Sequence, residues 1–138
     1  MVTAIETRIA EGLFARLAEL VLDPVLPIAY PNADFTPPGD NRWLKVTEIR
    51  APALAFALAA GGTRDHVGVL QVDVLWPQGT GMAAPRQVAD ALIAHFKPGT
   101  VIYRDGAKIK ITQAWIGQKL DDPPRMSLPV SLRYRAFG

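Results

Sequence analysis

The sequence predicts an α+β fold, in which two helices pack on one face of a mainly antiparallel, mixed β-sheet. Residues 2–22 and 85–96 repeat apolar side chains at intervals of three and four, which is the spacing of an amphipathic helix. Residues 67–76 and 127–137 alternate apolar and polar side chains, as half-buried strands do. The predicted order along the chain is helix, strand, strand, helix, hairpin, strand, which is typical of helices gathered on one side of an antiparallel sheet.

The composition indicates one globular domain over residues 1–138. Hydrophobic residues make up 49% of the chain and charged residues 20%, and a chain of this length buries enough surface to fold without disulfides or a structural metal. The absence of cysteine excludes disulfides and thiolate metal sites. No apolar run reaches the roughly 18–20 residues of a membrane span. Because Glu6 and Arg8 interrupt the apolar pattern near the start, we expect no signal peptide and synthesis in the cytoplasm.

The first helix is predicted over residues 2–22, and a proline-rich arm follows it. Thr3 and Glu6 have the spacing of a capping box, which places the helix start near Ala4. Residues 23–42 contain five prolines, so they cannot form a regular element. The apolar side chains among them would hold this segment as an extended arm against the domain or against a neighbouring copy.

The middle of the chain contains two strands and the second helix. Residues 43–49 suit a strand, whereas residues 51–66 are too rich in alanine to favour either helix or strand. Pro77 ends the strand at 67–76. The helix at 85–96 begins with a proline, which needs no hydrogen bond in a first turn, and Pro-Gly stops it.

The last third predicts a hairpin and a closing strand. Residues 100–103 and 107–116 flank an Arg-Asp-Gly turn, which is a hairpin signal. Residues 121–124, Asp-Asp-Pro-Pro, are predicted as a loop. The final strand, 127–137, contains Pro129, which cannot donate to a ladder. We therefore expect this strand at the edge of the sheet, or paired only beyond the proline.

No group of side chains predicts catalysis, a cofactor or a metal. His66 and His95 are isolated, and no carboxylates stand near them at the spacing of a metal site. The glycine-rich turn at 79–81 lacks the Lys-Ser or Lys-Thr pair of a phosphate-binding loop, which leaves a weak anion-binding option beside an ordinary strand-to-helix turn. Asp121 and Asp122 fit a solvated turn. We therefore predict no catalytic, cofactor-binding or metal-binding residue.

Four cations fall on the polar faces of two predicted strands. They are Lys108, Lys110, Arg133 and Arg135. If the two strands pair, all four line one side of the sheet. A solvated charged face explains this pattern, and so does a positive surface that faces DNA or an acidic partner.

The chain is also rich in aromatic and apolar side chains relative to one small core. Such a surplus is typical of the core of a protein interface and predicts a homo-oligomer, although a well-filled core with a pinned arm would also use it. Four aromatic residues are the candidates for a subunit interface: Tyr30, Phe35, Trp43 and Trp76.

A family resemblance is carried mainly by the segment that joins the best strand to the second helix. A glycine and an alternating strand at 68–74 precede a proline-glycine turn at 77–81, and the helix closes with Phe-Lys-Pro-Gly-Thr at 96–100. Two further stretches belong to the same pattern: the proline-rich 27–38 and the basic, aromatic 132–137. The chain thereby resembles the tail terminator family of long-tailed phages and gene-transfer particles, also called minor tail or tail completion proteins.

The resemblance implies a structural, non-enzymatic α+β subunit that forms a homo-oligomeric ring, usually of six copies. Such a ring caps the tail tube, stops its polymerisation and offers a surface for head joining. The implied partners are further copies of the chain, the tail tube protein and the head–tail connector protein. DNA would pass through the lumen without sequence preference, with no membrane and no cofactor involved. The implied location is the tail or neck of the virion, after synthesis in the host cytoplasm.

Two other classes of function stay open on the sequence. One is a neck or head-completion subunit, and the other is a non-enzymatic module that binds a ligand or a nucleic acid. An enzyme is least expected, because no nucleophile, base and orienting group converge in the sequence. The mass in solution separates these classes, since rings or polymers favour a virion subunit and a strict monomer favours the binding module.

Overall fold

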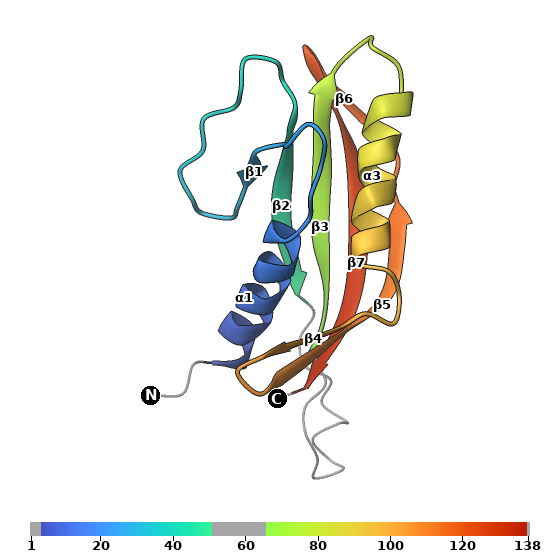
Figure 1. Cartoon of the computed structure of the whole chain (residues 1–138). Coiled ribbons are helices and arrows are strands. Elements are labelled where there is room, and N and C mark those ends of the chain that lie inside the picture. The colour runs from blue at the N-terminus through green and yellow to red at the C-terminus, as the bar shows by residue number, and fades with distance from the viewer. Residues whose placement is uncertain (1–3, 51–65, 138) are drawn as a thin grey trace.

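The computed structural model describes residues 4–50 and 66–137, and its α+β fold confirms the predicted class (Figure 1). In this part of the chain, helices α1 (Ile5–Ala18) and α3 (Ala83–His95) lie on the same side of one curled sheet. The strands are β1 (Ile28–Ala29), β2 (Trp43–Arg50), β3 (His66–Pro77), β4 (Val101–Arg104), β5 (Ala107–Ile116), β6 (Leu120–Asp122) and β7 (Arg125–Phe137). The stretch at 51–65, for which the sequence favours neither helix nor strand, lies outside the described residues.

The sheet has the order β1-β2-β3-β7-β5-β4, and β6 also pairs with β7. Strand β1 runs parallel to β2, while the other pairs are antiparallel, so the sheet is mixed as predicted. The longest strands, β3 and β7, lie side by side at its centre. Figure 1 shows β4 crossing beneath α1, so that the sheet curls around this helix.

Helix α1 buries one side through residues four apart. Ile9, Leu13 and Leu17 are each at most 1% exposed. Gly12 lies next to this stripe and brings the helix backbone close to β5, because a Cβ atom there would lie 2.8 Å from the Cδ1 atom of Ile109. Glycine therefore permits a close approach of helix and sheet, which offsets the roughly 1 kcal/mol that it costs a helix relative to alanine.

Both helices differ slightly from the predicted bounds. The apolar pattern of α1 continues to Leu22, but the backbone leaves the helix at Glu19, whose N–H bonds the carbonyl of Arg16 at 3.2 Å in a tightened last turn. Ala4 precedes α1 without a side-chain capping bond, and Thr3 of the predicted capping box lies outside the described residues. Helix α3 begins two residues before Pro85 and ends one residue before Phe96.

The predicted hairpin joins β4 to β5. Asp105 and Gly106 have φ angles of 48° and 88°. Positive φ at both central residues is the mirror-image turn that matches the twist of a two-residue hairpin, and aspartate and glycine are the residues that tolerate it.

The structure corrects two predictions near the end of the chain. The Asp-Asp-Pro-Pro segment is not wholly a loop, because Asp121 and Asp122 belong to β6 and pair with Met126 and Arg125 of β7. The prolines form the turn of this short hairpin. Composition favours a loop here, and the pairing partner was not visible in the local sequence.

Strand β7 contains Pro129, but it is not at an edge. Its pairing also does not start only beyond the proline, because residues 125–128 already pair with β3. It pairs with β3 on one side and with β5 and β6 on the other. The carbonyl of Pro129 accepts a hydrogen bond from Gly117 N–H at 2.8 Å. Since the N and O atoms of one residue in an antiparallel strand point to the same side, the missing N–H faces residues 117–119, where the neighbouring strand is interrupted between β5 and β6. A central strand therefore tolerates this proline.

Alternation along the strands gives the sheet two different faces. We call the side packed by α1 and α3 the covered face, and the other side the open face. On β7 the covered face holds Leu128, Val130 and Leu132, each at most 3% exposed. The open face holds Ser131, which is half-buried, and Arg133, which is exposed. The alternation predicted for β3 and β7 is thus confirmed.

A β-bulge interrupts the alternation of β5. The register shifts between Ile111 and Gln113, and the Thr112 hydroxyl donates to the carbonyl of Arg133 at 3.2 Å. Because a strand has a side-chain period of two, one extra residue moves the residues that follow it to the other face. Trp115 therefore lies on the open face, opposite Ser131.

The proline-rich arm, residues 23–42, wraps around the outer edge of β2. Two of its residues form β1 and pair with this edge, so the prediction that the arm contains no regular element is wrong at this point. The carbonyl of Pro27 accepts a hydrogen bond from Leu44 N–H at 2.9 Å. Tyr30 packs against Phe14 of α1, with ring centroids 5.3 Å apart. Phe35 packs against Trp43, which belongs to the open face, with centroids 6.0 Å apart. The arm thus contacts both faces of the sheet. It lies against its own domain, which is one of the two positions predicted for it.

Candidate assembly surface

The four predicted cations lie together on the open face. Strands β5 and β7 pair so that Lys110 faces Arg135, and Arg133 faces Gln113 across the bulge. Lys108 stands one step further along, opposite Phe137. All four cations are exposed, and we call them the basic band. The prediction that the four cations share one face of the sheet is confirmed. Their role in facing DNA or an acidic partner stays a prediction.

Apolar side chains border the basic band and remain in water. Val101 and Tyr103 of β4 stand opposite Lys110 and Lys108 and are 38% and 72% exposed. Trp115 of β5 lies on the same face and is 42% exposed. A surface that mixes large apolar groups with cations is typical of a protein-binding site, because isolated charge alone would not require the apolar groups.

The four aromatic residues predicted for a subunit interface make contacts within their own chain. Trp43 is 6% exposed and lies under the guanidinium of Arg125, whose Cζ atom is 4.9 Å from the ring centroid. Trp76 is 7% exposed, with the Cζ atom of Arg42 5.1 Å from its ring. Tyr30 and Phe35 are half-buried by the ring contacts of the arm described above. Each of the four thus contacts its own chain, and their role at a subunit interface stays a prediction. Two aromatic residues outside this predicted set, Tyr103 and Trp115, are more exposed.

Burial changes the acidity of Tyr30. Its partial removal from water disfavours the phenolate and raises the pKa of Tyr30 above its usual value of about 10. The neutral phenol is thus favoured where the ring packs between the arm and α1.

The two histidines have structural contacts. The Arg16 guanidinium donates to the carbonyl of His95, at 2.9 Å from Nη2, while the ring Nε2 of His95 bonds the carbonyl of Arg16. This reciprocal pair ties the end of α1 to the end of α3. His66 Nδ1 lies 3.8 Å from a carboxylate oxygen of Glu6. Among the described residues, no three histidine or carboxylate side chains gather as a metal site would require.

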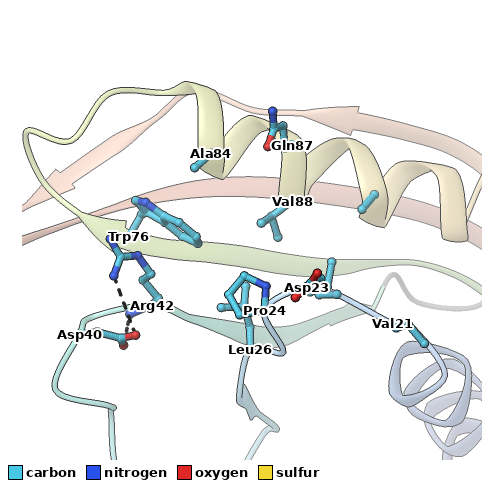
Figure 2. Close-up of a pocket in the computed structure, with 12 residues that line it drawn as sticks. Val21, Asp23, Pro24, Leu26, Asp40, Arg42, Trp76, Ala84, Gln87 and Val88 are labelled. Carbon is cyan, nitrogen blue, oxygen red and sulfur yellow. Dashed lines mark hydrogen bonds and ion pairs between the residues drawn. The ribbon is translucent and has the colours of Figure 1, made fainter.

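A groove of about 540 Å³ opens on the helix side, between α3 and the start of the arm. Figure 2 shows Trp76 and Val88 on one side of it, with Pro24 and Leu26 opposite. Its lining is mainly apolar. The ionisable groups that line it are Asp23, Asp40 and Arg42, of which the last two form an ion pair at 3.9 Å. This set offers no nucleophile with a neighbouring base, so the groove has no arrangement for covalent or acid–base catalysis.

The comparison with family models decides the classification of the chain. The model of the family described as phage tail terminator protein matches residues 8–134. The chain belongs to the phage tail terminator family. This tail terminator is therefore a structural protein of a phage-type tail, located in the tail of the virion, and the family resemblance stated from the sequence is confirmed.

Solved structures contain the same fold as this tail terminator. One chain is 30% identical and superposes with a TM-score of 0.79, covering 95% of this chain and 94% of that chain. Another, from the virion of a native gene transfer agent particle, is 12% identical with a TM-score of 0.70, and covers 99% of this chain and all of that chain (100%). No curated protein matches. In the described part of the tail terminator, no helix has the length and apolar character that a bilayer crossing needs.

Proposed function

We propose that this tail terminator forms a ring, expected to contain six copies, that caps the tail tube and stops its polymerisation. The same ring provides the surface to which the head is joined. The observation that carries the proposal is the family match over nearly the whole chain, residues 8–134. The likeness to a chain of a gene transfer agent virion supports a place inside an assembled particle.

The surface of the chain supports ring formation. A ring of identical subunits needs two different complementary surfaces on each copy, because head-to-tail contacts repeat around the closed circle. The basic band with its apolar border lies toward the β4 end of the sheet, and the arm wraps the β1–β2 end. Two unlike surfaces thus stand at opposite ends of one sheet.

The partners follow from this role. They are further copies of the chain, the tail tube protein on one side of the ring and the head–tail connector protein on the other. DNA passes through the lumen without sequence preference. The subunit is made in the host cytoplasm and joins the tail as it is completed.

The decisive experiment is deletion of the gene, followed by electron microscopy of the tails and heads. The proposal expects tubes that grow past their normal length and heads that stay unjoined. Tails of normal length with unjoined heads would contradict the role in stopping the tube and would favour a neck or head-completion subunit. Normal tails carrying normal heads would overturn a role in particle assembly.

A second measurement tests the ring itself. Native mass spectrometry of the purified chain, alone and bound to tail tubes, should reveal a closed oligomer. A chain that stays monomeric in both settings would contradict the ring and favour a monomeric binding module.

A further inference from the structure

We infer that the arm of one copy binds the basic band of the next copy, and that this contact closes the ring. The inference rests on the proposed function, since it names the two surfaces by which the ring would form. It is argued from the charge, position and exposed apolar area of the described residues.

The charges of this chain are separated along its surface. Residues 17–41 contain four carboxylates and no lysine or arginine. Of these, Asp23 and Asp34 are exposed on the arm, and Asp40 is paired with Arg42 at the end of the arm. The basic band presents four cations on two neighbouring strands. An acidic segment and a basic segment of similar extent therefore face solvent in each copy, and opposite potentials favour and orient an encounter between copies.

The positions of the two segments suit a head-to-tail contact. The arm covers the edge of β2, at one end of the strand order, and the basic band lies on β7 and β5, next to the other end. Within one chain, β2 and β3 lie between the edge that the arm covers and the strands of the basic band. The arm meets β7 at Arg125, which donates to Asn41 at 3.5 Å near the opposite end of that strand from Arg133 and Arg135. A head-to-tail arrangement brings opposite ends of neighbouring copies together, which is the arrangement that a closed ring repeats.

Exposed apolar side chains accompany both segments. Val25 of the arm is 82% exposed, and Val21 just before it is 87% exposed. On the other surface, Val101, Tyr103 and Trp115 border the basic band. Removing apolar area from water is favourable, so contact between the two surfaces would supply the attraction that exposed ion pairs alone do not.

The same apolar border distinguishes a protein partner from DNA. A duplex that slides through a lumen contacts cations through its phosphates, and it would leave Trp115 and Val101 facing water. An apolar and acidic segment such as the arm satisfies both kinds of side chain. We therefore assign the basic band to contact between copies, and contact with DNA becomes an outcome of the test.

The test reverses the charges on each surface separately. The band variant is Lys110→Glu with Arg133→Glu, and the arm variant is Asp23→Lys with Asp34→Lys. The matched control is Arg86→Glu with Lys97→Glu, which makes the same change of charge as the band variant at exposed positions on and just after α3. Circular dichroism and thermal unfolding establish that each variant is folded, and Lys110→Gln with Arg133→Gln replaces the band variant if it is not.

Assembly is measured by native mass spectrometry over a concentration series, in solution and on tail tubes. We expect the band variant and the arm variant each to need about tenfold or more protein for half assembly, because like charges would meet at the contact. A chain carrying all four reversals should regain assembly to within about threefold of the wild type, since the charges are exchanged and not removed. The control should assemble like the wild type.

Mixing gives a sharper result. Each defective variant keeps one normal surface, so the band variant and the arm variant can alternate around a ring with an even number of copies. The mixture should then assemble although neither variant does so alone, and raised salt should weaken the wild-type ring.

Four results would overturn the inference. Normal assembly of both variants would do so, and so would failure of the exchanged chain and of the mixture while the control assembles. A band variant that forms normal rings but slows DNA release would assign the basic band to the lumen. If the wild type itself forms no ring in solution or on tubes, the proposed function fails and this inference fails with it.

Discussion

The two faces of the sheet place opposite demands on neighbouring residues of β7. Leu132 is completely buried on the covered face, while Arg133, the next residue, is exposed on the open face. The covered face needs apolar side chains that fill a shared core with both helices, whereas the open face accepts small polar and charged groups. Folding stability therefore depends mainly on one face, and the other can vary to suit a partner. A tail terminator can change what it binds without changing how it folds.

The largest expected effect compares these two neighbours directly. Leu132→Ala should lower the free energy of unfolding by about 2–5 kcal/mol, because it leaves a cavity in the core. Arg133→Ala should change it by no more than about 0.5 kcal/mol, because its side chain lies in water. Denaturant titration measures both. Equal losses for the two variants would mean that the open face is covered within the isolated chain.

A second prediction concerns a glycine that makes room on the covered face. A Cβ atom on Gly68 would lie 2.5 Å from the Tyr134 hydroxyl and 2.9 Å from the carbonyl oxygen of Ile49. Gly68→Ala should therefore destabilise the chain by about 1–3 kcal/mol, because the tyrosine ring lies over this strand position and the backbone cannot yield easily.

Gly39→Ala is the matched control for Gly68→Ala, since no atom lies within 4 Å of the added methyl group. It should leave stability almost unchanged. Thermal unfolding of the two variants side by side tests the idea, and an unaffected Gly68→Ala protein would show that Tyr134 moves aside freely.

The third prediction concerns the backbone nitrogens of β7 residues on the open face, and compares Ser131 with Pro129. Ser131→Pro should cost about 1–3 kcal/mol, because it removes a ladder N–H that points toward β5 and leaves the acceptor on that strand unpaired. Pro129→Ala, two residues earlier, should change stability by less than about 1 kcal/mol, because that backbone nitrogen faces the gap between β5 and β6. A large loss for Pro129→Ala would contradict the gap as the reason that a central strand accepts this proline.

The smallest effect is a pH dependence at the arm. Burial raises the pKa of Tyr30 in the folded chain above its unfolded value of about 10, so the unfolded chain loses this proton first as the pH rises. The stability due to the buried phenol is therefore fully present below pH ~10 and falls as the pH rises through the folded-state pKa. Tyr30→Phe should remove that part of the decline. Stability curves of wild type and variant that remain parallel up to pH ~11 would mean that Tyr30 titrates as if exposed.

The periodic parts of the fold could be predicted from the sequence because their pattern is local. The alternation along β5 and β7 predicted that the cations of the basic band share one face, and the Asp105-Gly106 turn identified the hairpin that joins β4 to β5. Strand β6 and the central position of β7 could not be predicted, since both depend on which segments pair across the sheet. Pro129 favours an edge strand, because proline has no N–H to donate to a neighbour. A central strand accepts it here because the neighbouring strand is interrupted at residues 117–119.

The candidate surface was predicted in part for the same reason. The period of a strand is enough to predict that the four cations lie on one face of the sheet. It does not predict how exposed the aromatic side chains are. Trp43 and Trp76 have the composition of interface residues and are buried inside the chain by Arg125 and Arg42. Trp115 reaches the open face through the bulge at Thr112, and a single sequence carries no clear signal for the bulge.

The bulge at Thr112 divides β5 into two segments that can diversify separately. Before it, the outward positions carry lysines beside the β4 hairpin; after it, they carry Trp115 near the interruption of the sheet. Deleting Thr112 would remove the bulge and keep the same pairs with β7, so both lysines and Trp115 would stay on the open face of a regular strand. If β5 instead kept all its residues and paired without a bulge, Trp115 would share the covered face with Ile109 and Ile111. The extra residue is therefore what lets one strand place both the lysines and the tryptophan on the same open face.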